Sequence, residues 1–409
     1  MHPSSTASGV SPIDGPYAWL RLAISLVLGT IGGAGMWAVI VVLPSVQAEF
    51  GIDRAGASLS YAATLVGVAV GNVVVGRAID TVGYWRPALI SCLALGSGFI
   101  LASLAHSNMQ FVLAHGFLIG IGTAANFGPL IADISHWFQR RRGVAVAVAA
   151  AGNYIAGTIW PALMPWAIEA EGWRFTYAGI GVICLFTMIP LILLLRRPAP
   201  HEAFSVEGNA KPMLASSLSP RALQVLLVIA GLACCVAMSM PQVHLVAYCM
   251  DLGYGMARGS EMLALMMAAG IVSRIGSGFI ADWIGGVRTV LLGSILQCLA
   301  LLLYIPFDGL ASLYVVSLVF GLSQGGIVPS YAVVIREYLP AKEAGQRVGI
   351  VITATILGMA LGGWMSGWIY DLTGSYAAAF LNGIGWNLLN IFVMLTILSQ
   401  SRRRAQVAA

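Results

Sequence analysis

The sequence predicts an all-α membrane protein with twelve transmembrane helices arranged as two pseudo-symmetric six-helix bundles. Hydrophobic residues make up 59% of the 409 residues and charged residues only 9%, whereas a soluble chain would carry about 25% charged residues. Twelve apolar runs follow one another, each close to the about twenty residues that cross a bilayer as a helix. A motif of glycine and charged residues also occurs once in each half of the chain. These observations indicate a polytopic protein built from two similar halves.

The apolar runs divide the chain into five segments. We expect a tail at residues 1–17, a first bundle at 18–195, a linker at 196–221, a second bundle at 222–399 and a tail at 400–409. The linker is the longest polar stretch and contains four prolines, which suit a connection between bundles. The predicted spans lie near residues 18–45, 56–79, 87–105, 110–135, 143–168, 174–195, 222–250, 259–283, 288–306, 310–337, 345–370 and 375–399.

Basic residues predict the orientation. With twelve spans both termini lie on one side, and most lysines and arginines fall in the loops and termini of that side. The opposite loops hold only Arg54, Arg174 and Arg258. By the positive-inside rule, we expect a multi-pass protein of the cell inner (plasma) membrane with both termini cytoplasmic. The net charge of +5 forms no stripe, so no nucleic-acid partner is expected, and the first seventeen residues do not resemble a signal peptide.

One charge stands out at membrane depth. Arg274 lies in the segment Met262–Ala281, which is otherwise uncharged. A guanidinium there costs at least about 2.5 to 3.5 kcal/mol on insertion scales. We read Arg274 as the single central charge, facing a protein-lined cavity and binding an anion. The alternative is an arginine paired with an internal acid, but Asp251 and Asp282 lie near the ends of their apolar runs.

Other polar residues at membrane depth are candidates for contact with the same substrate. They are Asn126, Asn153, Tyr154, His244 and Tyr331, most of them beside proline or glycine, where a locally opened helix frees backbone groups. Each could instead make an interhelical hydrogen bond. His244 receives more weight because an imidazole titrates near neutral pH.

Enzyme and metal signatures are not found. The sequence contains no P-loop lysine motif, no HExxH, no nucleophile elbow and no central pair of carboxylates. We therefore expect neither an enzyme nor a cofactor. The cysteines all fall inside apolar runs without metal-binding spacing, so we expect no metal and no disulfide; they are Cys92, Cys184, Cys234, Cys235, Cys249 and Cys298.

The repeated motif supports the two-bundle prediction. Its copies are Gly76-Arg-Ala-Ile-Asp80-Thr-Val-Gly83-Tyr-Trp-Arg86 and Gly278-Phe-Ile-Ala-Asp282-Trp-Ile-Gly285-Gly-Val-Arg288, 202 residues apart. The glycines allow tight turns and close helix approach, and we expect the aspartates and arginines to pair at the cytoplasmic face. The motif resembles the signature between spans two and three of the major facilitator superfamily. That resemblance implies two bundles rocking around a midplane site, with these eight residues as a conformational switch.

Two further segments resemble the proton-linked monocarboxylate transporter family. Asp14, Gly15 and Trp19 match part of that family's motif at the entry to span one, and Arg140 and Arg141 match its entry to span five. Asp14 is also expected to cap the first helix and tether it to basic loops. The resemblance implies that Arg274 in span eight is the substrate arginine.

Two positions depart from that family. The lysine that several members use in span one corresponds to Trp37, and the acid four residues before the arginine corresponds to Gly270. Proton coupling by that lysine and acid therefore cannot be transferred to this chain.

We therefore expect a monomeric secondary active transporter that carries a small organic anion, such as lactate or pyruvate, by alternating access with proton symport. Alternatives are an oxalate/formate-type exchanger, which would need a basic residue in span eleven, and a non-transporting receptor. GxxxG spacings such as Gly67–Gly71, Gly116–Gly120 and Gly363–Gly367 suit helices that repack between states. Which carboxylate is carried, and whether protons or exchange drive transport, are left open.

Overall fold

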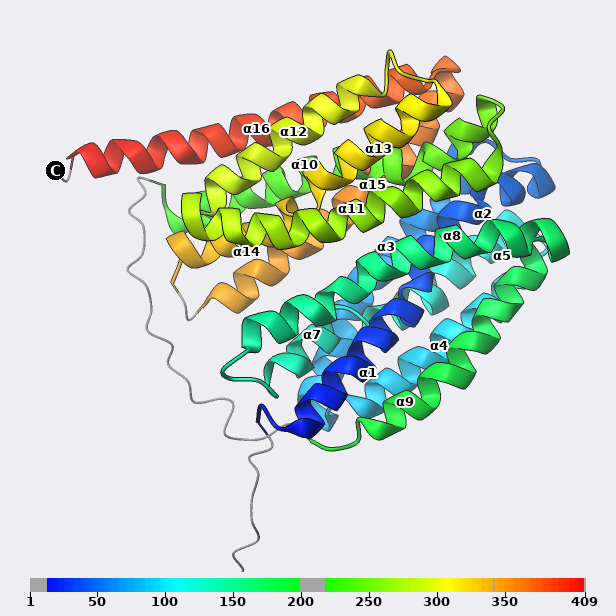
Figure 1. Ribbon diagram of the computed structural model, residues 1–409, viewed down its shortest axis with the longest axis horizontal. Coiled ribbons are helices and arrows are strands. Elements are labelled where there is room, and N and C mark those ends of the chain that lie inside the picture. The colour runs from blue at the N-terminus through cyan, green and yellow to red at the C-terminus, as the bar shows by residue number, and fades with distance from the viewer. Residues whose placement is uncertain (1–12, 199–217, 341–342, 408–409) are drawn as a thin grey trace, which may run out of the picture.

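The computed structural model describes residues 13–198, 218–340 and 343–407, and all regular structure in them is helical. The two bundles lie side by side along their length (Figure 1). The first contains α1 (Pro16–Gly32), α2 (Ala34–Phe50), α3 (Arg54–Val82), α4 (Trp85–Ser103), α5 (Asn108–Leu113), η1 (Ala114–Gly120), α6 (Ile121–Ala124), α7 (Gly128–Ser135), α8 (Arg142–Ile183), η2 (Cys184–Met188) and α9 (Ile189–Leu194). The second contains α10 (Pro220–Asp251), α11 (Gly255–Ile284), α12 (Gly286–Leu303), α13 (Leu310–Gln324), α14 (Ile327–Tyr338), α15 (Ala344–Thr373) and α16 (Tyr376–Val407).

These elements form the twelve predicted spans. Among the described residues, 11 helical stretches are long and apolar enough to cross a membrane, and one of them, Arg142–Leu194, has 53 residues. That stretch reverses at Gly172, where φ is 80°, so it supplies spans five and six. The all-α, twelve-span prediction is therefore confirmed. The predicted tail and linker residues 1–12, 199–217 and 408–409 lie outside the described residues. The C-terminal tail predicted from residue 400 is helical as far as Val407, where α16 ends, and its boundary stays a prediction.

Helix breaks occur at only some of the predicted places. Between α6 and α7 the helix opens just after Asn126, where Phe127 is non-helical and Pro129 lies in the first turn of the next helix. By contrast, α10 continues through Pro241 and α8 through Asn153. The predicted local openings at those two positions are wrong, because the backbone stays helical there.

Small residues bring the helices close together within each bundle. A Cβ added at Gly67 would lie 2.1 Å from the carbonyl oxygen of Gly116, and one at Gly362 would lie 2.3 Å from that of Val236. Only glycine permits such backbone contact. The predicted role of the GxxxG spacings in close helix approach is confirmed at these crossings.

A buried ion pair that was not predicted from the sequence joins helices of the first bundle. Arg21, 1% exposed, lies in α1 and binds Asp133 of α7 through two hydrogen bonds of 2.7 and 2.9 Å. Its guanidinium also donates to the carbonyl oxygen of Leu195, so spans one, four and six are joined. Because Arg21 bonds Leu195 beside the linker end of span six, it lies away from the centre of the bundle, and the interpretation of Arg274 as the single central charge stays a prediction. Arg21 and Asp133 neutralise each other, as buried charges must.

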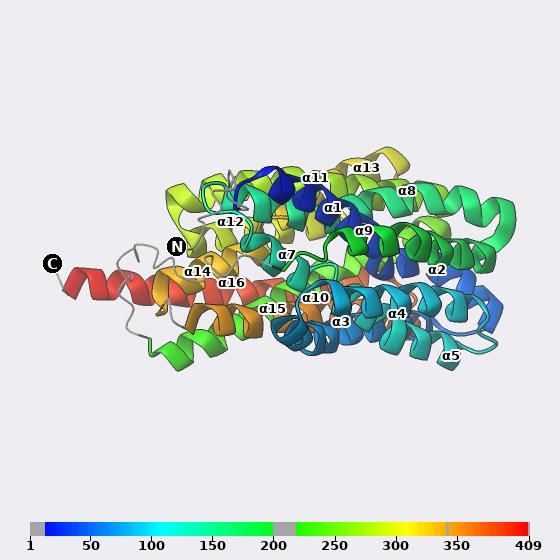
Figure 2. The same cartoon turned by 90° about the horizontal axis from the view of Figure 1, so that it is seen from below.

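The two bundles meet unevenly. We call the ends of the helices near residues 82–86, 194–198 and 218–221 the linker face, and those near residues 50–54, 251–255 and 373–376 the far face. The bundles contact each other most extensively through α3 with α15 and α8 with α11, at opposite edges of the molecule (Figure 2), and also through α2 with α10. From the far face the ribbons diverge toward the linker face, where α7 and α14 lie apart (Figure 1).

Candidate functional site

Arg274 lies at the junction of the two bundles. It is on α11 of the second bundle, partly exposed, and its guanidinium carbon is 4.9 Å from the ring centroid of Tyr154 on α8 of the first bundle. Among the described residues, no side-chain hydrogen bond or ion pair of this guanidinium is formed. The cation is therefore held against an aromatic face, with its N–H donors free to bind a ligand.

Gly270 explains why Tyr154 takes this position. A Cβ at Gly270 would lie 2.4 Å from Cε1 of the Tyr154 ring, so no acidic side chain fits there. An acid one turn before Arg274 would compete with a substrate carboxylate for the guanidinium. The aromatic ring instead stabilises the charge by about 0.5 to 2 kcal/mol without accepting a hydrogen bond from it in this geometry. The departure from the monocarboxylate transporter pattern at this position thus leaves the Arg274 guanidinium available to bind an anion.

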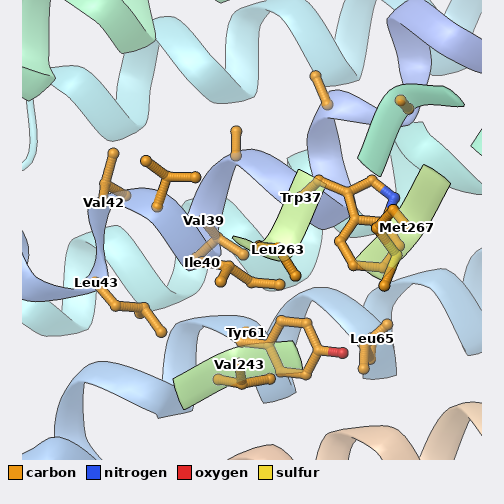
Figure 3. Close-up of a cluster of buried hydrophobic side chains, with 14 of the residues drawn as sticks. Trp37, Val39, Ile40, Val42, Leu43, Tyr61, Leu65, Val243, Leu263 and Met267 are labelled. Atoms are coloured by element: carbon orange, nitrogen blue, oxygen red, sulfur yellow. The ribbon is translucent and has the colours of Figure 1, made fainter. Parts of the chain in front are cut away.

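Trp37 occupies the second departing position and forms an apolar wall. Its indole Nε1–H lies 3.0 Å from the backbone oxygen of Asn153 and 3.2 Å from Oδ1 of the same residue. The ring packs beside Gly157, where Met267 also approaches. In Figure 3 Trp37 and Met267 lie together above Tyr61 and Leu65, in a layer contributed by both bundles. Because α11 runs from the far face to the linker face and Met267 precedes Arg274 by two turns, this apolar layer lies between the far face and the level of Arg274.

The other predicted contacts of the substrate are only partly brought together. Arg274 and Tyr154 touch, and Asn153 is next to Tyr154 but is engaged by Trp37. Asn126 lies against α1, with its side-chain nitrogen 2.4 Å from where a Cβ of Gly32 would be. Tyr331 is fully buried and donates to Oδ1 of Asn390 at 2.9 Å. Asn126 and Tyr331 thus make interhelical contacts within their own bundles.

His244 is also held within its own bundle. It is 2% exposed, and its Nε2 lies 2.8 Å from the carbonyl oxygen of Gly363, to which it donates. Its ring lies 6.0 Å from that of Tyr376 near the far face. A second buried imidazole, His115, lies between Thr64 and Tyr177 in the first bundle. His244 therefore lies toward the far face, and it is one of two buried imidazoles among the described residues.

Comparisons with known proteins agree with this architecture. The sequence model of the Major Facilitator Superfamily matches residues 26–312 and 286–408. This chain belongs to the Major Facilitator Superfamily. It is 27% identical over 405 residues to Monocarboxylate transporter 13 of Bos taurus, covering 94% of this chain and 90% of that protein. It is 25% identical to Monocarboxylate transporter 11 of Homo sapiens, covering 92% of this chain and 82% of that protein.

Relatives and solved structures extend the comparison beyond that group. The MFS-type transporter pynF of Aspergillus niger is 24% identical over 335 residues, covering 81% of this chain and 76% of that protein. A crystal structure of a bacterial homologue of the human lysosomal transporter Spinster, described as inward-facing and occupied, has a TM-score of 0.73 at 13% identity. It covers 95% of this chain and 97% of that one, so the fold is shared. These relatives are transporters, and the prediction that the chain is not an enzyme is confirmed.

The superfamily motif lies exposed at the linker face. Gly83 and Gly285 have φ of 78° and 85°, so each turn requires a glycine. Gly76 and Gly278 have no atoms within 4 Å of an added Cβ. The charged members of the motif are exposed and form no ion pair among the described residues; they are Asp80, Arg86, Asp282 and Arg288. The expected pairing of these charges is therefore not formed in this conformation, in which the bundles diverge at that face.

The segments that resemble the monocarboxylate transporter family contact each other. The Asp14 carboxylate accepts hydrogen bonds from the backbone N–H groups of Gln139 and Arg140 at 3.3 and 3.1 Å. Trp19 packs edge-on against Phe138, and the Arg141 guanidinium lies 5.7 Å from the centroid of the Trp19 ring. The tether to the basic loop is confirmed. The helix-capping role is wrong, because Gly15 is the N-cap residue of α1 and has no side chain.

Charged groups close the far face between the bundles. Arg54, at the start of α3, binds both carboxylate oxygens of Asp251 on α10 at 2.6 and 2.7 Å. Asp371, at the end of α15, accepts hydrogen bonds from the backbone N–H groups of Arg54 and Ala55 at 2.9 and 2.7 Å. These contacts, which we call the far-face lock, join the bundles by ion pairing and by a carboxylate at a helix N-terminus.

We expect Asp371→Asn to open the far face, because the amide loses the charge that stabilises the N-terminus of α3, worth about 0.3 to 1 kcal/mol. In a protein carrying Ser58→Cys, modification by a membrane-impermeant thiol reagent from the far face should become about two- to fivefold faster. Ser58 is 1% exposed and packs against Gly367 of the other bundle, so a cysteine there becomes accessible to the reagent only when the two bundles separate at the far face. The exposed Asp308→Asn serves as the control. Equal rates in both variants would show that the lock does not hold the far face.

Proposed function

We propose that the protein is a secondary active transporter that moves a small organic monoanion, a monocarboxylate such as lactate or pyruvate, by alternating access together with a proton. The observation that carries this proposal is the free guanidinium of Arg274, stacked on Tyr154 at the junction of the bundles. Its fork of N–H donors matches a carboxylate bidentately. The similarity to Monocarboxylate transporters 13 and 11 supports the same substrate class.

The position of Arg274 couples binding to movement of the bundles. The cation belongs to α11, whereas its aromatic partner belongs to α8, so a carboxylate bound to Arg274 lies against both bundles. Binding neutralises a charge that is costly at membrane depth. The loaded site can then be enclosed as the linker-face surfaces approach and the far-face lock opens.

The linker face is the cytoplasmic face in this proposal. The basic loops of the sequence gather there, as the positive-inside rule requires. The described conformation, closed at the far face and divergent at the linker face, is then open to the cytoplasm. In the opposite state, Asp80 and Asp282 would find partners at the linker face and the far-face lock would be broken.

Proton coupling is proposed on energetic grounds. Moving a monoanion against a negative-inside potential costs about 2.3 kcal/mol per 100 mV, and a co-transported proton cancels that charge. His244 and the substrate carboxylate itself are the candidate carriers. Because His244 bonds Gly363, which packs against Tyr61 of the first bundle, a change in its protonation would act through the contact between the bundles.

A dianion exchanger has less support. It would need a second basic residue inside span eleven, and the arginine of α15, Arg347, lies near its start and pairs with Glu343 at 2.6 Å. A receptor on the same fold would bind the anion without transporting it. Transport measurements distinguish such a receptor from a transporter.

We expect Arg274→Lys to lose substrate affinity about tenfold or more while the protein still inserts, because lysine keeps the charge but not the bidentate fork. The measurement is uptake and binding of lactate, pyruvate and acetate by purified protein in proteoliposomes and detergent. Arg258→Lys, an exposed arginine that pairs with Glu261, is the matched control. Wild-type affinity in the Arg274 variant would contradict the assigned site.

Uptake should rise as the pH on the far side falls from about 8 to about 6, since protonation of an imidazole or a substrate accompanies transport. We expect His244→Gln to flatten this response without abolishing exchange at fixed pH, because glutamine can still donate to Gly363 but does not titrate. His106→Gln, at an exposed position, is the control. An unchanged pH profile in the His244 variant would leave His244 as a structural hydrogen-bond donor and assign coupling to another group.

A further inference from the structure

The hydroxyl group of Tyr61 is buried and makes no hydrogen bond to the described part of the protein. The residue lies on α3, is 1% exposed, and belongs to the layer where the bundles meet. Burying an unpaired hydroxyl is unfavourable, so a phenylalanine would serve this conformation better.

The ring of Tyr61 already accounts for its packing. A Cβ at Gly363 of α15 would lie 2.9 Å from Cδ1 and Cε1 of Tyr61, so the second bundle accommodates the ring with a glycine. The hydroxyl oxygen contributes nothing to that fit. In Figure 3 it points toward Leu65, on the side where Trp37 and Met267 lie, and away from Val243.

The place of Tyr61 along the molecule suggests when the hydroxyl is used. On α3 it lies two turns from Arg54 of the far-face lock, within the apolar layer that separates the far face from the level of Arg274. Its ring contacts Gly363 of the other bundle, so separation of the bundles at the far face uncovers it. An anion entering from that side would pass it before reaching Arg274.

We propose that the Tyr61 hydroxyl is a substrate-binding group of the outward-facing state, donating a hydrogen bond to the oxyanion of a monocarboxylate that enters from the far face. This inference rests on the proposed function and adds a residue to its site. A phenol donates well to a carboxylate, and a charged acceptor strengthens the bond. In the described state the hydroxyl is sealed, so the same residue does not serve substrate that enters from the linker face.

Sidedness of substrate affinity tests the proposal. In proteoliposomes of known orientation, lactate exchange is measured while lactate is varied on one face and kept saturating on the other, for the wild type and for Tyr61→Phe. The expected result is a far-face KM raised about two- to tenfold, as for the loss of one hydrogen bond, with the linker-face KM unchanged. Tyr376→Phe is the matched control, because its hydroxyl is also buried and unpartnered among the described residues but lies among the rings of Tyr248 and Tyr370. It should leave both KM values unchanged.

Three results would overturn this proposal while the proposed function stands. An unchanged far-face KM would do so directly. A raised far-face KM with a linker-face KM lowered by a similar factor would show that the hydroxyl only biases the population of the two states. A lower thermal stability of detergent-purified Tyr61→Phe would show that the hydroxyl has a partner inside the protein.

If the wild type exchanges none of lactate, pyruvate and acetate, the proposed function fails and this inference with it. If Arg274→Lys abolishes exchange while Tyr61→Phe behaves as the wild type, this inference fails alone.

Discussion

The cost of placing a guanidinium inside a membrane constrains much of this structure. Arg274 is kept at membrane depth by an aromatic ring from the opposite bundle rather than by an acid. That arrangement requires Gly270, because any side chain there would collide with Tyr154. It also requires the two bundles to meet at this level. A cation that is stabilised without being neutralised is suited to bind and release an anion repeatedly, whereas an ion pair would have to be broken each time.

The two faces of the molecule are held by different means. At the far face, Arg54, Asp251 and Asp371 join the bundles through directional polar contacts, and glycines allow the rings and backbones to approach. At the linker face, the repeated motif presents turns fixed by glycine and exposed carboxylates without ion-pair partners among the described residues. The far-face charges are paired in this conformation whereas the linker-face charges are not, as the proposed alternation between two closed faces requires.

Much of the fold could be predicted from the sequence because lipid imposes simple rules. Apolar length gave the spans, and the register of Gly76 with Gly278 gave the two halves. The charge of Arg274 inside an apolar run indicated the candidate site. Residue partners were harder, since Tyr331 and His244 are polar residues at membrane depth whichever neighbour they meet. Their bonds to Asn390 and to the carbonyl of Gly363 depend on how helices are rotated, which hydropathy does not report.

Arg21 and Asp133 show a signal that was present but overlooked. Each lies near the end of a predicted span, where a single charge usually reaches the interface, yet two opposite charges inside neighbouring helices of one bundle can pair and stay buried. The sequence marked Tyr154 as a polar residue at membrane depth but not as the partner of Arg274. Its ring can lie there because Gly270, on the opposite bundle, has no side chain. The contact between bundles is thus the part of the site that sequence periodicity describes least.

The central claim is that the protein carries a monocarboxylate across the membrane through the site at Arg274. Counterflow tests it most directly: proteoliposomes loaded with unlabelled lactate are diluted into a trace of labelled lactate without any ion gradient. The account predicts a transient accumulation of label above equilibrium in loaded vesicles, absent from empty vesicles and from vesicles containing Arg274→Lys. Binding of lactate without such an overshoot would contradict the account and indicate a receptor on the same fold.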